Sequence, residues 1–167
     1  MASFHTKTFK VHDEYYTPKS AWEDVKHLIP ENNIIWEAFS MSSERSADYL
    51  RDLGFEVRSN NNDFFNCPPP TDITMIVSNP PFSIAKQVMP KLKELDIPFM
   101  LIMPSSKLIT NYFREWKDKG IQIIIPRKRI QFDKDKDGVI TTSNKCNFDC
   151  FYYCYGLNLE RDITWLE

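Results

Sequence analysis

Short apolar segments alternate along this chain with segments of helical periodicity, and this alternation constrains the fold more than any other feature. The apolar segments have the length of buried strands and end at polar or turn-forming residues: 33–39, 55–58, 72–78, 98–103 and 121–125. Between them, apolar residues recur at helical spacing over 19–29, 43–53, 83–95 and 106–119. This order predicts a Rossmann-like α/β three-layer sandwich, in which helices cover both faces of a mostly parallel sheet.

The last third of the chain departs from the alternation. Residues 127–132 and 147–155 are strand-like and flank the polar segment Asp133–Gly138, which predicts an antiparallel hairpin and an antiparallel C-terminal strand. The polar segment also matches the first half of a calcium-binding loop. Its twelfth position is Asn144 rather than glutamate, so we interpret the segment as a hairpin turn with Gly138 at positive φ. No metal is expected.

Length and charge limit the organisation of the protein. A chain of 167 residues has room for one domain, so residues 1–167 are expected to form a single unit. The formal net charge of −2 argues against a strongly basic, non-specific nucleic-acid binder. No apolar run approaches the ~20 residues that cross a bilayer, and the first residues lack the apolar core of a secretory signal.

The cysteines indicate the compartment. Cys146, Cys150 and Cys154 have a C-x3-C-x3-C spacing, which differs from the C-x2-C spacing of a zinc ribbon. Together with Cys67, they are expected to be free thiols in a reducing environment. The protein is therefore expected to be intracellular and cytoplasmic, and not to bind a membrane.

The strongest functional signal is Asn79-Pro80-Pro81-Phe82, which directly follows the apolar segment 72–78. Ligands of parallel α/β sheets bind at the carboxyl ends of the strands. At that place the Asn79 side-chain oxygen and the Pro80 carbonyl are two acceptors suited to the hydrogens of an exocyclic amine. Phe82 adds a flat apolar surface on which a planar base can stack. These residues predict a site for a ring that carries an exocyclic amine.

With this motif, the chain resembles the class I S-adenosylmethionine-dependent N6-adenine DNA methyltransferases, especially the compact forms of phages and large DNA viruses. The resemblance covers most of the chain, and it implies that Asn79, Pro80, Pro81 and Phe82 are catalytic. It also implies that the segments around 126–132 and 147–153 flank the target base. S-adenosylmethionine is the implied cofactor, and adenine in DNA is the implied substrate.

The same resemblance assigns the cofactor-binding residues. Tyr16, Thr17 and Pro18 match the N-terminal motif that lies along the methionine part of the cofactor. The start of the cofactor loop and the pair that holds the adenine ring complete the set: Glu37, Phe39, Ser40, Asp63 and Phe64.

Two departures from the family pattern concern the cofactor loop. Met41 and Ser43 stand where the family has glycines, which let the backbone approach the cofactor closely. The acidic residue that holds the ribose hydroxyls in the family is also missing after 55–58, where the chain reads Arg58-Ser59-Asn60. Two interpretations therefore remain open. The protein is an active methyltransferase, or a non-catalytic methyltransferase-like subunit with a structural, assembly or nucleic-acid-binding role.

The partners follow from the same residues. The cluster Arg127, Lys128 and Arg129 is expected to contact nucleic-acid phosphates, although a solvated strand edge explains it equally well. DNA is the expected acceptor, with an RNA base or a protein side-chain amide as alternatives. No separate target-recognition domain is expected, so sequence specificity is expected to be low, to arise from loops, or to come from a protein partner.

Overall fold

The computed structural model describes residues 15–40, 43–59, 63–136, 139–142 and 147–167. Among these residues, none of the helices has both the length and the apolar character required to cross a bilayer. Within the same ranges, nowhere do three or more His, Cys, Asp or Glu side chains gather as metal ligands.

A seven-stranded sheet with the order β10-β6-β9-β5-β4-β2-β3 forms the centre of the molecule. Its strands are β2 (Ile34–Glu37), β3 (Glu56–Ser59), β4 (Met75–Ser78), β5 (Phe99–Pro104), β6 (Gln122–Ile125), β9 (Cys150–Tyr155) and β10 (Ile163–Trp165). All neighbours are parallel except β9, which is antiparallel to both β5 and β6. The prediction of a mostly parallel sheet with an antiparallel strand from the 147–155 segment, here β9, is therefore confirmed. The chain leaves β2 toward β3 on one side and returns to β4 on the other, so a topological switch point lies between β2 and β4.

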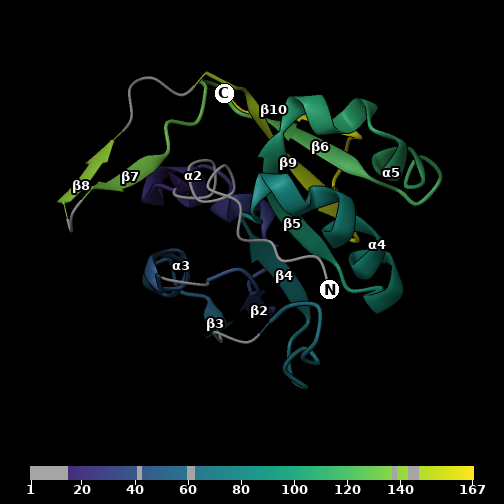
Figure 1. Cartoon of the computed structure of the whole chain (residues 1–167), viewed down its shortest axis with the longest axis horizontal. Helices are drawn as coiled ribbons and strands as arrows, with labels where there is room; N and C mark the ends of the chain where they lie inside the picture. The colour runs from purple at the N-terminus through teal and green to yellow at the C-terminus, as the bar shows by residue number, and fades with distance from the viewer. Residues whose placement is uncertain (1–14, 41–42, 60–62, 137–138, 143–146) are drawn as a thin grey trace.

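Helices cover both faces of this sheet (Figure 1). One face carries α2 (Lys19–Glu23), the 3-10 turn η1 (Lys26–Leu28) and α3 (Arg45–Asp52). The other face carries η2 (Phe82–Ile84), α4 (Ala85–Leu95), η3 (Ser105–Ile109) and α5 (Asn111–Arg114). The three-layer α/β architecture follows directly from the alternation of strands and helices in the chain.

Each face of the sheet has its own apolar core, because successive strand residues point to opposite faces. On β5, Met100 and Ile102 belong to the core with α2 and α3, whereas Leu101 and Met103 belong to the core with α4 and α5. All four side chains are fully buried. An unbroken apolar run, rather than an alternating one, is what a strand covered on both faces requires.

Two predicted helices are shorter than expected. The segment 106–119 forms η3 and the four-residue α5, because Thr110 between them has extended backbone angles (φ −79°, ψ 153°). The segment 19–29 divides into α2 and η1 at Val25 (φ −111°, ψ 0°). β-branched residues lose side-chain freedom in a helix, and both interruptions fall on such a residue. Helical spacing alone did not reveal these breaks.

The predicted hairpin between 127–132 and 147–155 is wrong. Residues 127–132 form no strand, and they bury Ile130 and Phe132 instead. The hairpin consists of β7 (Asp133–Lys136) and β8 (Val139–Thr142), and β7 also pairs with β1 (Tyr15–Tyr16). The polar segment interpreted as a turn is thus largely strand β7, while Gly138 lies outside the described residues. Backbone pairing on both sides of β7 outweighs the low strand propensity of its Asp and Lys residues.

The tail after β9 also contains an element that the sequence did not indicate. Residues 163–165 form β10, which lies parallel to β6 at the edge of the sheet. Among the cysteines described, Cys150 and Cys154 are buried free thiols on one face of β9, and Cys67 is half-buried. Cys146 lies outside the described residues.

A glycine substitution tests the packing after β9. Gly156 has φ +73°, and a Cβ atom there would lie 3.0 Å from Cβ and Cγ of Pro98. We expect Gly156→Ala to lower the free energy of unfolding by about 1–3 kcal/mol, as measured by chemical denaturation. Gly120→Ala is the matched control, because Gly120 has φ +78° but no atom within 4 Å of its Cβ position. Equal losses in the two variants would show that the Pro98 contact contributes nothing.

Candidate functional site

The carboxyl ends of β2 and β4 are joined at the switch point. Glu37 is the last residue of β2 and Ser78 is the last residue of β4. The Ser78 hydroxyl donates a hydrogen bond to Oε1 of Glu37, which also accepts the backbone N–H of Phe39 at 3.0 Å. This bond fixes the residue that immediately precedes Asn79.

Glu37 is a buried carboxyl group with only 2% of its surface exposed. Burial raises its pKa to about 7, although hydrogen bonds from Ser78, Phe39 and Ser46 oppose the rise. Ser46 in turn accepts a hydrogen bond from the indole N–H of Trp22 at 2.8 Å. Glu37 therefore connects β2, β4 and α3 from inside the protein, and it positions the loop after β2 rather than facing solvent.

Asn79 holds a buried polar atom that no described residue pairs with. Its side-chain Oδ1 is buried and has no hydrogen-bond partner among the described residues. The adjoining Pro80 and Pro81 lack backbone N–H groups and restrict φ, and Pro81 (φ −56°, ψ 123°) caps η2. A buried acceptor left unpaired costs about 1–3 kcal/mol, so this oxygen is suited to a donor from outside the described part of the chain.

Phe82 lies in an aromatic cluster with Tyr15, Phe132 and Phe148. The ring centroid of Phe82 is 5.5 Å from that of Phe148 and 6.0 Å from that of Phe132, both in edge-to-face geometry. Tyr15 contacts the same two rings, at 5.7 Å and 6.1 Å. The structure thus brings both segments expected to flank the target base to Phe82. Phe132 and Phe148 were not singled out from the sequence, since only the fold places them there.

The N-terminal motif lies beside α3. Thr17 is buried, and Pro18 precedes α2 with extended backbone angles. The guanidinium carbon of Arg45 lies 4.8 Å from the ring centroid of Tyr16. This contact holds the start of α2 next to the start of α3, which follows the loop after β2 in the chain.

Asp63 and Phe64 form a turn that packs on the loop after β2. The Asp63 carboxylate accepts the N–H of Phe65 at 2.9 Å and the side-chain amide of Asn66 at 2.5 Å, which holds the pKa of Asp63 below its usual range. Phe64 is buried, with ring centroids 4.7 Å from Phe39 and 5.7 Å from Trp36. The structure therefore brings Phe39 and Phe64 into contact.

A carboxylate is present at the end of β3, although none follows that strand in the sequence. The Ser59 hydroxyl donates to Oε2 of Glu44, whose side chain is 46% exposed. Arg51 donates to the Ser59 hydroxyl at 3.1 Å and lies 3.6 Å from Glu44. Glu44 precedes α3, fifteen residues before Ser59, so no local sequence signal reveals this proximity.

The remaining predicted residues are less closely connected. Arg127 and Lys128 are exposed, whereas Arg129 forms a two-pronged ion pair with Asp149 at 2.7 Å and 3.3 Å. This pair lowers the pKa of Asp149 and joins the segment after β6 to the start of β9. Ser40 is buried, and its carbonyl accepts the N–H of Ser43 at 2.9 Å. Met41, like Ser42, lies outside the described residues.

Comparison with known proteins gives no family assignment. No protein-family model and no curated protein sequence matches this chain. Among solved structures, the chain is similar to a SAM-dependent O-methyltransferase from Thermotoga maritima, with a TM-score of 0.48 and 10% identity over 85% of this chain and 66% of that one. It is also similar to the tRNA (m1A58) methyltransferase TrmI from Aquifex aeolicus, with a TM-score of 0.43 and 11% identity over 85% and 69% of the two chains. This chain thus spans about two thirds of either structure. Both TM-scores are below 0.5, so function has to be argued from the site itself.

Proposed function

We propose that this protein transfers a methyl group from S-adenosylmethionine to the exocyclic amine of an adenine base in DNA. The observation that carries the proposal is the buried Oδ1 of Asn79, which has no hydrogen-bond partner among the described residues. It stands at the carboxyl end of β4, beside the switch point, where α/β sheets bind their ligands. A lone acceptor at that place suits an amine hydrogen.

The chain's own residues act on the acceptor nitrogen. The lone pair of an aromatic exocyclic amine is delocalised into the ring, which makes the nitrogen a poor nucleophile. Asn79 Oδ1 and the Pro80 carbonyl accept the two amine hydrogens and draw the lone pair back onto nitrogen. S-adenosylmethionine, when bound, would supply the methyl group as the electrophile and leave as S-adenosylhomocysteine, and the methylated nitrogen would release one proton to solvent. Ser78 and Glu37 hold the backbone that presents Asn79, and they do not touch the base.

The aromatic cluster supplies the surface for the base. The rings of Phe132 and Phe148 pack against Phe82 in edge-to-face geometry, so a base that stacks on Phe82 requires a shift of a neighbouring ring. A base extruded from a duplex is commonly held by stacking on aromatic side chains. The partly buried rings of Phe82, Phe148 and Tyr15 offer such stacking, whereas Phe132 is fully buried and supports them.

The residues at the ends of β2 and β3 fit S-adenosylmethionine. The exposed Glu44 carboxylate, held by Ser59, offers the ribose hydroxyls the acceptor that the sequence lacks after β3. The exposed turn at Asp63 and the ring of Phe39 offer an acceptor and an apolar surface for the adenine part. Tyr16, Thr17, Pro18, Ser40 and Phe64 complete the proposed set. Glu37 is withdrawn from it, because internal donors occupy its carboxylate.

The nucleic-acid contact rests on exposed cations near the aromatic cluster. Arg127 and Lys128 are exposed, and they precede Phe132 in the same segment. Arg129 stabilises this segment through its ion pair with Asp149. Sequence specificity then comes from the loops or from a protein partner. An RNA base or a protein amide as acceptor would use the same two oxygens.

The proposal is tested by ligand titration together with methyl transfer. We expect S-adenosylhomocysteine to bind in a calorimetric titration, and labelled methyl to appear at N6 of adenine in duplex DNA. DNA in which every adenine is replaced by 2-aminopurine, which lacks the N6 amine, should accept none. Transfer to RNA or to a glutamine-containing peptide in place of DNA would contradict the proposed acceptor. Absence of both binding and transfer would contradict the enzymatic function.

The proposed role of Glu44 gives a separate prediction. We expect Glu44→Gln to weaken S-adenosylhomocysteine binding by about 10- to 100-fold, because a charged acceptor for the ribose is lost. The matched control is Asp48→Asn, because Asp48 also pairs with Arg51, at 2.9 Å, but has no contact with Ser59. Calorimetry with S-adenosylhomocysteine compares the two variants. Equal affinities would show that Glu44 serves only the ion pairs of α3.

A second candidate function is non-catalytic binding by a methyltransferase-like subunit. The observation that favours it is the closed aromatic cluster, in which the ring of Phe82 already meets two neighbours. A protein that keeps these contacts would bind nucleic acid or a partner without accepting a base. DNA binding in the absence of S-adenosylhomocysteine binding would support this function over the enzymatic one.

A further inference from the structure

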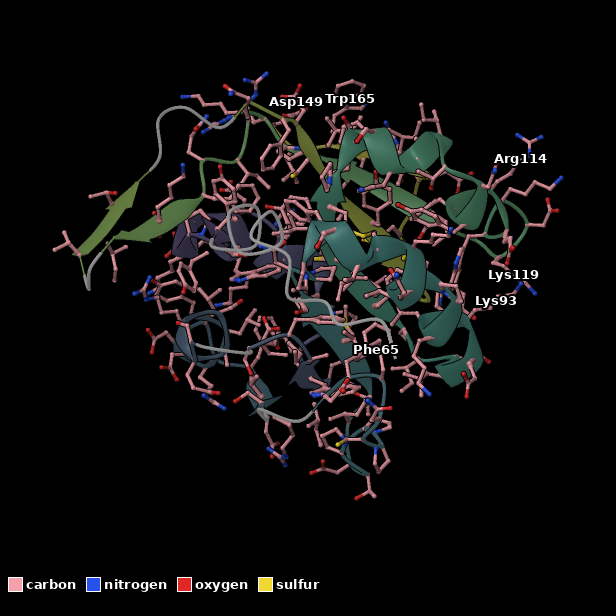
Figure 2. All side chains as sticks on the ribbon, viewed as in Figure 1. Phe65, Lys93, Arg114, Lys119, Asp149 and Trp165 are labelled. Atoms are coloured by element: carbon pink, nitrogen blue, oxygen red, sulfur yellow. The ribbon has the colours of Figure 1, made fainter. Side chains whose placement is uncertain are left out.

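The sheet ends at β10, a short edge strand that carries two large exposed apolar side chains. Among the described strands, β10 pairs only with β6. Ile163 and Trp165 are 52% and 70% exposed, and Figure 2 shows Trp165 at the upper rim of the molecule. Edge strands of soluble proteins are normally short, charged, or interrupted by prolines or bulges, and large exposed apolar side chains on them are unusual. Two large apolar side chains on this edge therefore indicate an interface.

The backbone groups of β10 alternate between β6 and the open edge. The Asp162 carbonyl accepts the N–H of Ile123 at 2.8 Å, and the Leu166 N–H donates to the Ile125 carbonyl at 3.0 Å. Residues 162, 164 and 166 therefore face β6, and Ile163 and Trp165 direct their N–H and C=O groups outward. A second antiparallel strand can pair with these outward groups.

We propose that this protein forms a symmetric dimer through antiparallel pairing of β10 with β10 of a second copy, on a two-fold axis at Thr164. In this register Ile163 lies opposite Trp165 of the second copy, and the two residues exchange their outward N–H and C=O groups. Thr164 faces its own counterpart as a non-hydrogen-bonded pair. The two-fold axis doubles every contact, as an isologous interface requires.

Charge and shape complementarity support a second copy of the chain as the partner of β10. Arg161 and Glu167 flank β10 and are both exposed, and the register places the guanidinium of each copy across from the carboxylate of the other. Ile163 also lines a hollow of about 370 Å³ whose apolar walls include Leu108, Ile109 and Phe113. Because Trp165 of the second copy lies opposite Ile163 on the same face, its indole lies beside this hollow. A buried tryptophan in a pocket is a typical centre of binding energy.

The mass in solution gives the first test. Analytical ultracentrifugation of the full chain is expected to show a concentration-dependent species of twice the 19.7 kDa chain mass. Trp165→Lys should raise the dimer dissociation constant by at least about 30-fold. Val139→Lys is the matched control, because Val139 is 61% exposed on the separate strand β8. A monomer at every concentration, or a dimer that survives Trp165→Lys, would overturn the proposal.

Two further variants test the register. Thr164→Cys should form a disulfide-linked dimer under mild oxidation, because Cβ atoms of a directly opposed pair lie about 4.5–5.5 Å apart. Trp165→Cys should not, because that residue faces Ile163 rather than its own counterpart. Arg161→Glu should weaken the dimer, and adding Glu167→Arg should restore it. Cross-linking of Trp165→Cys alone, or no restoration by the double reversal, would refute this register.

Discussion

Replacing Asn79 with alanine is expected to lower the rate of methyl transfer to adenine by about 10²–10³-fold, because one of two preorganised acceptors for the amine is lost. Stability should be unchanged or slightly higher, because Oδ1 of Asn79 is buried and receives no hydrogen bond from the described residues. Transfer of labelled methyl and thermal melting, measured on the same preparations, separate the two effects.

A second asparagine provides the control for this experiment. The side chain of Asn33 donates to the Pro30 carbonyl at 3.1 Å and accepts the Thr74 hydroxyl at 2.8 Å, away from the end of β4. Asn33→Ala should therefore reduce stability and leave the methyl-transfer rate nearly unchanged. If Asn79→Ala retained wild-type transfer while its melting temperature fell, Asn79 would be a turn-forming residue and not a catalytic one.

The stability of the protein is expected to fall between about pH 4.5 and about pH 7, because of Glu37. Burial raises the pKa of this group from 4.5 to about 7 in the folded protein. The folded state therefore binds the proton more tightly than the unfolded state does. The stabilising contribution is complete below pH 4.5 and is lost as the pH rises through 7.

The expected loss is about 3 kcal/mol, which corresponds to roughly 6–12 °C in melting temperature for a chain of this size. Asp63 and Asp149 have lowered pKa values, so they stay ionised over this range and do not contribute to the slope. Glu37→Gln keeps the shape and removes the titration, so its melting temperature should vary much less with pH. Parallel curves for the wild type and the variant would show that Glu37 is not responsible.

The proposed dimer and the proposed activity are independent of each other. β10 lies at one edge of the sheet, and the site lies at the carboxyl ends of β2, β3 and β4, near the opposite edge. A monomeric variant such as Trp165→Lys should therefore bind S-adenosylhomocysteine as the wild type does. If the protein transferred no methyl group, the proposed dimer would be unaffected. If the protein were a monomer, the proposed activity would be unaffected.

Sequence patterns predicted the buried strands well. They did not predict β7 and β10, which are strands because of the backbone pairing with their neighbours. Strands β4 and β5 are unbroken apolar runs, so their burial on two faces was evident. β7 consists of alternating Asp and Lys residues, and it is a strand because β1 and β8 pair with it on either side. β10 is only three residues long and exposes two of its side chains, so no pattern marked it.

The functional site divides in the same way. Asn79, Phe82, Phe39 and Phe64 could be proposed from the sequence because motifs near the ends of strands are local in sequence. Glu44 was not, because its carboxylate reaches Ser59 from another element. Glu37 was recognised as a residue of the cofactor loop, but its hydrogen bonds to Ser78 and Ser46 turn it inward. A motif can show which residue types are present, whereas the direction of a side chain depends on donors that are distant in sequence.

The sequence by itself therefore determined the α/β class of this protein, the parallel strands of its core and the position of Asn79 after a buried strand. These properties depend on local periodicity and on motifs a few residues long. Only the tertiary structure decided that the Asn79 oxygen lacks a partner among the described residues, that Phe132 and Phe148 meet Phe82, and that β10 leaves an open edge. Each of these depends on contacts between segments far apart in the chain, which chain folding brings together and local sequence does not encode.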